Sequence, residues 1–360
     1  MLDLHELLRY TVEQRGSDLH VKVGSVPHVR VDGHLAPAPF DYVTPEDSER
    51  MAFQVLPPAR ADEFVAENEA DFAHSVPGLG RFRANVFRQR GSIGLVFRRV
   101  LPGTPSFESL GLPPVIRRLA DEPRGMLLVT GPTGSGKTTT VAAMIDHINE
   151  TKAVNIVTVE DPIEVLHPDK KSIVNQREIG TDTKDYAQAM KRVLRQDPDV
   201  IFIGEMRDPE TVWAALAAAE TGHLVISTLH TTNATETVNR IVDFFPPFQQ
   251  KQIRMTLAAS LRGVISQRLL ERADGNGRIP STEVMVMTGR VFDRIIDPES
   301  QHTIEEVTAE GEYYCMQTFD QSLFNLYKNG LVGLRDALAV ASHPHDFRLM
   351  LQQEGLATSF

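Results

Sequence analysis

The first hundred residues combine helical and strand-like hydrophobic patterns. Leu4, Leu7 and Leu8 recur at the spacing of one helix face, and a glycine stop follows. Alternating segments, turn residues and further helical stretches predict the other elements: strands at 18–23 and 26–31, helices at 45–56 and 58–67, and three strands between 70 and 100. This mixture predicts a compact α+β domain over residues 1–100.

The hydrophobic pattern changes after residues 101–106, where two prolines and a glycine predict a linker. Beyond it, short apolar runs rich in β-branched residues alternate with helical stretches. The runs are GMLLVTG, VNIVTVE, DVIFIGE and HLVISTLH. Strands that are apolar on both faces and separated by helices are typical of a parallel sheet with crossover helices. We therefore expect an α/β core over residues 107–280.

The last part of the chain has a mainly helical pattern. From about Phe248, the segment QQKQIRMTLAASLRGVISQRLL predicts a long helix, and shorter helical stretches follow it. A helical C-terminal region is expected over residues 281–360. The predicted fold class of the whole chain is α/β, with the α+β domain first.

Composition narrows the location and the partners. Of the 360 residues, 41% are hydrophobic and 24% are charged, as in ordinary globular proteins. The single cysteine, Cys315, excludes an internal disulfide and a four-cysteine zinc site, which favours the cytosol. Residues 1–18 lack the apolar stretch of a signal peptide or a membrane span. We expect a cytoplasmic protein without direct membrane insertion. A net charge of −11 argues against a nucleic-acid partner, because phosphate contacts need basic surfaces.

The strongest chemical signal is the glycine-rich sequence GPTGSGKT at residues 131–138. It follows an apolar strand and opens a helix, the arrangement in which backbone N–H groups and a helix N-terminus bind phosphate. Lys137 is expected to reach the β- and γ-phosphates, and Thr138 to offer its hydroxyl to Mg²⁺. The pattern predicts an ATP site. Its expected nucleotide-binding residues are Pro132, Thr133, Gly134, Ser135, Gly136, Lys137, Thr138 and Thr139.

Acidic residues follow two later strands. Glu205 ends the strand DVIFIGE, where a carboxylate can hold the hydration shell of Mg²⁺. Glu160, Asp161 and Glu164 lie at the end of VNIVTVE, and three acids beside a phosphate site are costly unless they bind metal or polarise water. We assign Glu164 the role of orienting and deprotonating the attacking water. The alternative is that these acids only cap the following turn.

Two histidines bracket the strand LVISTL. His230 follows its C-terminal end, where ligands bind in parallel sheets, and a neutral imidazole there can hydrogen-bond a γ-phosphate. We assign a catalytic role to His230 and to His223, although a lone histidine is more often a satisfied core residue. No metal-ligand spacing accompanies the pair, so zinc is not expected.

Arginines cluster between residues 81 and 99, where there are six and no acid. They are Arg81, Arg83, Arg88, Arg90, Arg98 and Arg99. The cluster indicates an anionic partner, either nucleic acid or the γ-phosphate of the same or a neighbouring subunit's ATP. Several of the six belong to a solvated strand face in the simpler interpretation.

The order and spacing of these motifs resemble the secretion ATPases of type II, type IV and pilus systems. GPTGSGKTTT resembles their Walker A sequence, VTVEDPIE their Asp box, GEMRD their Walker B sequence and TGHLVISTLHTTNA their His box. The resemblance implies a PAS-like N-terminal domain, a RecA-like ATPase core, ATP and Mg²⁺ as ligands, and a homo-hexamer. It places the catalytic glutamate at Glu164 and the Walker B glutamate at Glu205. It also implies that N-terminal arginines contact the nucleotide and take part in catalysis, with Arg81, Arg83, Arg98 and Arg99 as the candidate positions.

Within that family, the chain resembles the motors that retract type IV pili. The opening RGSDLHVKVGSVPHVRVDG and the tail MQTFDQSLFNLYKNGLVGLRDALAVASHPHDFRL carry this resemblance. It implies an inner-membrane pilus platform protein as the partner, and possible work beside a paralogous pilus ATPase. One departure is residues 291–298, VFDRIIDP, which stand where autonomous retraction motors carry AIRNLIRE.

That departure keeps other functions open. The chain could be an accessory motor, or an ATP-binding regulator that depends on a partner retraction ATPase. A nucleic-acid translocase and a small-molecule P-loop kinase are weaker alternatives, since the chain is acidic and no acceptor-binding lid is evident.

Overall fold

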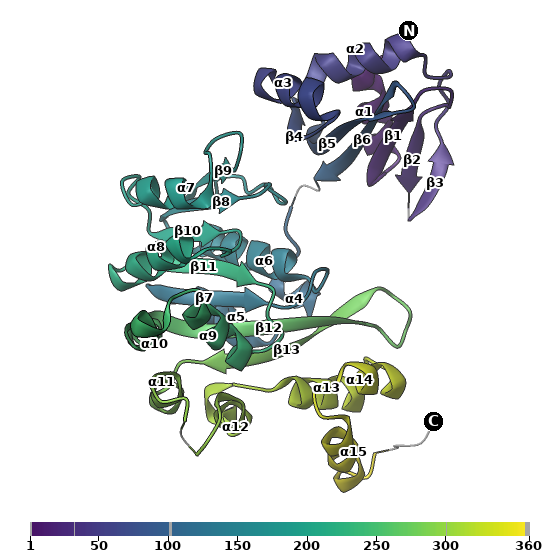
Figure 1. Ribbon diagram of the computed structural model, residues 1–360. Coiled ribbons are helices and arrows are strands. Elements are labelled where there is room, and N and C mark those ends of the chain that lie inside the picture. Colours follow the sequence, from purple (N-terminus) through teal and green to yellow (C-terminus); the bar gives the residue numbers. More distant parts are fainter. Residues whose placement is uncertain (1, 32, 101–102, 300, 357–360) are drawn as a thin grey trace. The chain divides into compact units, whose positions relative to one another are not determined.

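The computed structural model describes residues 2–31, 33–100, 103–299 and 301–356 (Figure 1). The chain forms two compact units. The first holds residues up to Gly103 together with Glu164–Leu166, and the second holds the rest. Of the predicted linker, residues 101 and 102 lie outside the described residues, and residues 103–106 contain neither helix nor strand.

The first unit is a six-stranded antiparallel sheet with three helices. Its elements are α1 (Leu4–Glu13), β1 (Asp18–Lys22), β2 (His28–Val31), β3 (His34–Pro37), α2 (Pro45–Val55), α3 (Pro58–Glu67), β4 (Glu69–Val76), β5 (Gly80–Gln89) and β6 (Ser92–Val100). The strand order is β3-β2-β1-β6-β5-β4. Leu7 on α1 and Met51 on α2 share one core with Phe82 of the sheet. The expected helices and strands are confirmed; β3 is additional, and its fully exposed residues give no hydrophobic period.

The second unit is built on a seven-stranded sheet in the order β13-β12-β7-β11-β10-β8-β9. Its first elements are α4 (Phe107–Leu110), α5 (Pro114–Ala120), β7 (Gly125–Thr130), α6 (Lys137–Thr151), β8 (Asn155–Glu160), β9 (Ile173–Glu178), α7 (Tyr186–Val193), β10 (Val200–Ile203), α8 (Pro209–Glu220) and β11 (Leu224–Leu229). They are followed by α9 (Ala234–Asp243), α10 (Pro247–Ser260), β12 (Leu261–Glu271), β13 (Arg278–Val286), α11 (Gly289–Ile296), α12 (Ile304–Ala309), the short 3₁₀ turn Glu312–Tyr314, α13 (Phe319–Lys328), α14 (Leu334–Val340) and α15 (Pro344–Gln353).

Both faces of this sheet are buried, as the continuous apolar runs predict. Met126 and Leu128 of β7 enter a core shared with the helices from α7 to α12. Leu127 and Val129 enter the core on the opposite face, under α4, α5 and α6. Because successive side chains of a strand point to opposite faces, a strand between two helical layers must be apolar at every position.

The prediction of one long helix beginning near Phe248 is wrong in its second half. Helix α10 ends at Ser260, and the next residues form strand β12. β12 pairs in parallel with β7 and antiparallel with β13. The expected boundary between the core and the helical region, at residues 280 and 281, therefore lies inside strand β13. Its residues are apolar enough for either structure, so periodicity alone cannot decide between them. The β-branched Val264 and Ile265 pack between sheet neighbours, and tertiary packing decides for a strand.

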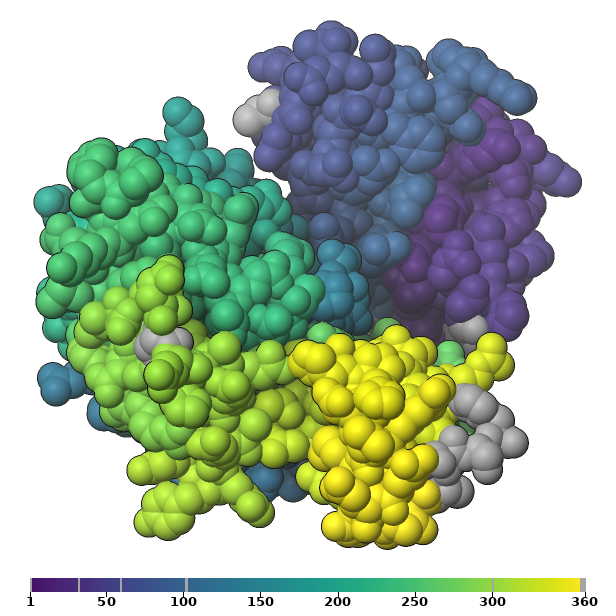
Figure 2. Space-filling model, turned by 60° about the horizontal axis from the view of Figure 1, so that its bottom comes forward, coloured from purple at the N-terminus to yellow at the C-terminus, as the bar shows by residue number. Residues whose placement is uncertain are grey.

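The C-terminal helices form a separate small core with the turn end of the β12–β13 hairpin. Leu270 and Ile279 of the hairpin pack with Leu323, Phe347 and Leu351 from α13 and α15. Figure 2 shows these helices, in yellow, as a continuous mass beside the light-green segment that precedes them. Among the described helices, none is long and apolar enough to cross a bilayer.

Candidate active site

The four predicted motifs lie at the same edge of the parallel sheet. β7, β8, β10 and β11 run parallel, so their carboxyl ends coincide (Figure 1). Ile203 pairs with Val159 on one side and with Ser227 on the other, and Thr130 pairs with Leu229. The glycine-rich loop, the acidic segment after β8, Glu205 and His230 therefore follow adjacent strands. Ligands of open α/β sheets bind at such an edge.

The loop at residues 131–136 has the backbone that phosphate binding requires. Gly131, Gly134 and Gly136 have φ angles of 141°, 79° and 90°. Residues with a side chain rarely adopt such positive φ angles, so glycine is needed at these three positions. Lys137 opens α6, and its Nζ donates hydrogen bonds to the carbonyls of Gly131 (2.7 Å) and Pro132 (3.0 Å). The Oγ of Ser135 is buried and has no partner among the described residues. This loop can therefore surround an anion.

Oxygen donors for a hard cation lie beside the loop. Thr138 is exposed in the first turn of α6, and Thr139 is half-buried. Glu205 follows β10 with its side chain largely buried. It contacts Arg207, and His230 Nε2 lies 3.5 Å from its Oε2. A hydroxyl and a carboxylate beside a phosphate loop are the donors that Mg²⁺ prefers, so the residues fit this ion.

Arg207 of the GEMRD segment contacts Glu205, although it is not among the predicted site residues. Its hydrogen bond to Glu205 raises the pKa of the guanidinium above its ordinary value. Tyr186, on α7, has a raised pKa because it is buried, and because Asp161 and Glu205 lie near it. None of the predicted motifs contains Tyr186. It lies near the carboxyl edge of the sheet because α7 packs there.

The acidic segment after β8 divides into buried and exposed carboxylates. Glu160 is buried and accepts hydrogen bonds from Thr158 (2.6 Å) and Gln176 (3.1 Å). Glu178 of β9 accepts the backbone N–H of Ile163 at 3.0 Å, which fixes the chain next to Glu164. Glu164 itself is exposed. Glu160 is therefore a structural acid, and Glu164 remains the accessible candidate base.

The two histidines lie at opposite ends of β11. His230 is 57% exposed at the carboxyl edge. His223 precedes the strand, and its Nδ1 lies 2.9 Å from the carbonyl oxygen of Ala218. Six residues of strand separate them, roughly 20 Å. The structure therefore groups His230 with Glu205 and leaves His223 away from that edge; its catalytic role stays a prediction.

The four arginines predicted to reach the nucleotide lie on two neighbouring strands of the first unit, β5 and β6. Arg83 is directly opposite Arg98, and Arg81 shares their face two residues along β5. Arg99 is opposite Phe82 and so projects to the other face. Arg98 Nε donates to Asp18 at 2.8 Å. Burial alone would raise the pKa of Asp18, but its hydrogen bonds from Arg98 and Ser17 hold it below the ordinary value. Arg98 is thus paired with Asp18, whereas Arg83 is exposed and its Nη1 lies 3.5 Å from Oε1 of Glu164.

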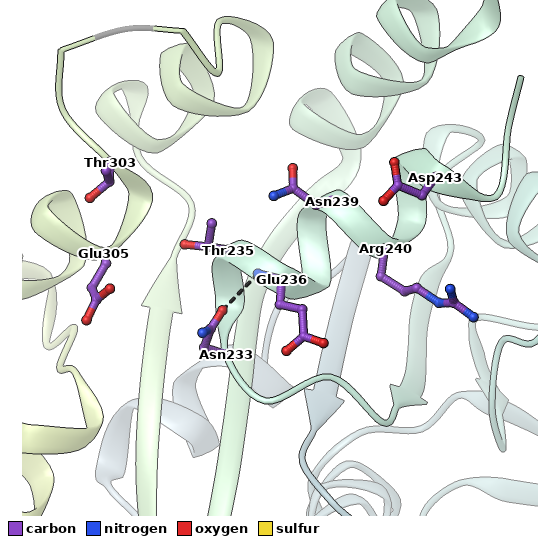
Figure 3. Close-up of a pocket in the computed structure, with 8 residues that line it drawn as sticks. All are labelled: Asn233, Thr235, Glu236, Asn239, Arg240, Asp243, Thr303 and Glu305. Atoms are coloured by element: carbon purple, nitrogen blue, oxygen red, sulfur yellow. Dashed lines mark hydrogen bonds between the residues drawn. The ribbon is translucent and has the colours of Figure 1, made fainter. Parts of the chain in front are cut away.

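A polar pocket lies next to the His230 segment (Figure 3). It has a volume of about 580 Å³ and is lined by side chains from α9 and from the segment that starts α12: Asn233, Thr235, Glu236, Asn239, Arg240, Asp243, Thr303 and Glu305. Asn233 caps α9 by accepting the N–H of Glu236 at 2.8 Å. None of the predicted nucleotide-binding residues lines this pocket, so it is distinct from the phosphate loop.

Known proteins share this fold and these motifs. The family model described as Type II/IV secretion system protein matches residues 108–328. The chain is 41% identical over 96% of its length to the whole of the type IV pilus retractation ATPase PilT of Pseudomonas aeruginosa. It is 39% identical over 98% of its length to the type IV pilus ATPase PilU of the same organism, covering 92% of that protein.

A solved structure extends the likeness to three dimensions. The crystal structure of the pilus retraction motor PilT with bound ADP matches with a TM-score of 0.89 at 45% identity, over 96% of this chain and 99% of that one. The similarity therefore covers both units and the sheet edge that carries the motifs. This chain belongs to the Type II/IV secretion system protein family, among its type IV pilus retraction ATPases.

Proposed function

We propose that this chain is an Mg²⁺-dependent ATPase that powers type IV pilus retraction. The observation that carries the proposal is the convergence of the phosphate loop, Glu205 and His230 on adjacent strand ends. Near-full-length similarity to a retraction ATPase and to an ADP-bound motor supports it. We further propose a cytoplasmic homo-hexamer that reaches the inner membrane through the pilus platform protein.

The chain's own groups divide the hydrolysis between them. Lys137 exchanges the carbonyls of Gly131 and Pro132 for β- and γ-phosphate oxygens. Glu164 takes a proton from the attacking water as the water oxygen bonds to the γ-phosphorus and the bond to the β-phosphate oxygen breaks. The products are ADP and phosphate. Thr138, and Glu205 through water, would hold Mg²⁺, which when bound would neutralise charge on the phosphate oxygens.

His230 is proposed to report the presence of the γ-phosphate. Its imidazole lies beside Glu205, so a hydrogen bond to phosphate competes with this carboxylate contact. A change of partner at His230 would move the segment that leads into α9. The roles of Arg81, Arg83, Arg98 and Arg99, at the nucleotide of the same or a neighbouring subunit, remain part of the proposal.

The test of the proposal is phosphate release by the purified protein with Mg²⁺-ATP. We expect Glu164→Gln to lower turnover by about 100-fold or more, because general-base catalysis contributes that much. Glu220→Gln is the matched control: this exposed glutamate ends α8, and its substitution should leave turnover unchanged. Turnover per chain should rise with protein concentration if a ring completes the site. Equal turnover in wild type and Glu164→Gln would contradict the role of Glu164, and no turnover in wild type at any concentration would contradict the motor.

A second candidate, an accessory motor that depends on a partner ATPase, has one specific observation in its favour. Residues 289–296 form α11, which buries Val291 and Ile295 and exposes Asp293. An acidic residue thus occupies an exposed position where the resemblance implies an arginine. The similarity to PilU over nearly the whole chain is consistent with this candidate.

A further inference from the structure

A residue outside all four motifs contacts the phosphate loop from the neighbouring strand β12. β12 lies beside β7, and Ser266 pairs with Thr130, the last residue of β7. The hydroxyl of Thr130 donates to the Oγ of Ser266 at 3.0 Å. The next residue on β12 is Gln267, which is 3% exposed. Gln267 therefore lies level with Gly131, where the chain leaves the sheet to form the loop.

The backbone and the side chain of Gln267 both touch the loop. A Cβ atom on Gly131 would lie 2.3 Å from the Gln267 carbonyl oxygen, and one on Gly136 would lie 2.8 Å from its Nε2. The hydroxyl of Thr140 donates to the Gln267 Oε1 at 2.8 Å. One residue thus contacts the first glycine of the loop, the last glycine, and the first turn of α6.

These contacts limit how the loop can move. Gly131 and Gly136 have positive φ angles, which glycine adopts readily. Because glycine has no side chain, neither residue can be held in place by side-chain contacts of its own. Lys137, Thr138 and Thr139 lie between the two points that the Gln267 carboxamide contacts. Because backbone N–H groups bind phosphate only when they point at it, fixing both sides of this turn keeps the donors preorganised.

We propose that Gln267 is a positioning residue of the phosphate-binding loop, which holds the first turn of α6 in its nucleotide-binding orientation through Thr140. The inference rests on the proposed nucleotide site. It adds that the strand bearing Gln267 sets the affinity of that site without touching the nucleotide. No local pattern indicates this role, because Gln267 follows the loop by more than a hundred residues, in a segment whose hydrophobic pattern predicts a helix.

The test compares ADP affinity with stability in matched variants. We expect Gln267→Leu to raise the Kd of a fluorescent ADP analogue by about tenfold, since the hydrogen bond from Thr140 and the contact of the carboxamide with Gly136 are lost. Gln317→Leu is the control, because Gln317 also bonds within the same unit, donating to the Thr282 carbonyl at 2.8 Å. The control should lose stability without a change in Kd. Equal Kd values in wild type and Gln267→Leu would overturn the inference.

The partner residue gives a second test that does not depend on tolerance at Gln267. Thr140→Val removes only the hydroxyl, and we expect it to raise the Kd for ADP, whereas Thr140→Ser keeps a donor and should restore the wild-type value. In the Gln267→Leu/Thr140→Val double variant, the Kd should rise no further than in the weaker-binding single variant, because both changes break one bond. Additive effects, or no rescue by serine, would contradict the proposal. If wild type and Lys137→Ala bind the analogue equally, the nucleotide site itself is wrong.

Discussion

At the scale of single residues, Glu283 is a carboxyl group buried in the core of the ATPase unit. It is 5% exposed on β13, and its Oε1 accepts the N–H of Ala234, the first residue of α9, at 2.6 Å. Burial raises its pKa to about 7, and the nearby Glu305 and Asp320 act in the same direction. The Ala234 hydrogen bond and Arg268 oppose the shift. Glu283 thereby ties β13 to the helix that follows the His230 segment.

This raised pKa predicts a loss of stability as pH increases. The folded chain keeps the Glu283 proton up to about pH 7, whereas the unfolded chain releases it near 4.5, so the folded state binds more protons between these values. The contribution is fully present below pH 4.5 and is lost by pH 7, with a size on the order of 3 kcal/mol. Glu283→Gln keeps the acceptor without the charge, and should flatten the pH profile of urea unfolding between pH 5 and 8. Glu271→Gln, at the exposed end of β12, should leave the wild-type profile; a Glu283→Gln profile parallel to wild type would refute the assignment.

Residues of the site differ in how far the sequence could predict them. Lys137 and Thr138 follow from the glycine-rich sequence, because its spacing fixes their places relative to the loop. Gln267 and Glu283 do not, since each acts on a segment far away in the sequence, and a polar residue within an apolar run carries no signal of its partner. His223 looks equivalent to His230 in the sequence, and only the direction of β11 separates them.

At the scale of elements, α8 follows Glu205 and is started by a well-formed cap. Asp208 accepts the Thr211 N–H at 2.7 Å and the Thr211 hydroxyl at 2.8 Å, and Pro209 occupies the first turn. These contacts satisfy donors that a helix start leaves unpaired. α8 therefore begins at an Asp-Pro pair, and Gly222, with a φ angle of 109°, follows just past its C-terminal end.

The Asp208 cap should contribute measurably to the free energy of unfolding. Asp208→Ala should lower the free energy of unfolding by about 1 kcal/mol, and Asp208→Asn by less, because asparagine also caps well. Asp243→Ala is the contrasting variant: this exposed acid ends α9, where a negative charge opposes the helix dipole, so its removal should not destabilise. Urea unfolding of the three variants provides the measurement. Equal losses for Asp208→Ala and Asp243→Ala would show that the cap contributes nothing particular.

Element types were predictable where flanking signals agreed with the hydrophobic period. The parallel strands and α8 have such signals, and so do the elements of the first unit apart from β3. β12 lacks them: an apolar helix runs directly into an apolar strand at Leu261 without an intervening turn. Its pairing with β7 and β13 is a long-range property, which a local pattern does not contain.

At the scale of the whole molecule, α11 bears on whether the chain retracts a pilus alone. α11 is anchored by its buried Val291 and Ile295, and Arg254 donates to the Ile295 carbonyl at 3.3 Å. The exposed Asp293 and Asp297 stand at the two positions where the resemblance implies arginines. Two negative charges thus replace two positive ones on a surface whose backbone is held by the ATPase unit.

Whether the chain retracts a pilus without a partner ATPase can be measured in cells. In a piliated strain without its own retraction ATPases, we expect this chain alone to restore twitching motility, because the predicted nucleotide-binding residues are all present in the sequence. Restoration only together with a partner retraction ATPase would instead establish the accessory role. In that outcome, Asp293→Arg with Asp297→Arg should confer retraction without the partner, whereas Asp293→Asn with Asp297→Asn, which removes the charges without adding positive ones, should not. ATP turnover of both double variants should match wild type, since α11 follows β13 and contributes none of the residues assigned to the phosphate site. A loss of turnover in either variant would mean that α11 acts on hydrolysis rather than on the transmission of force.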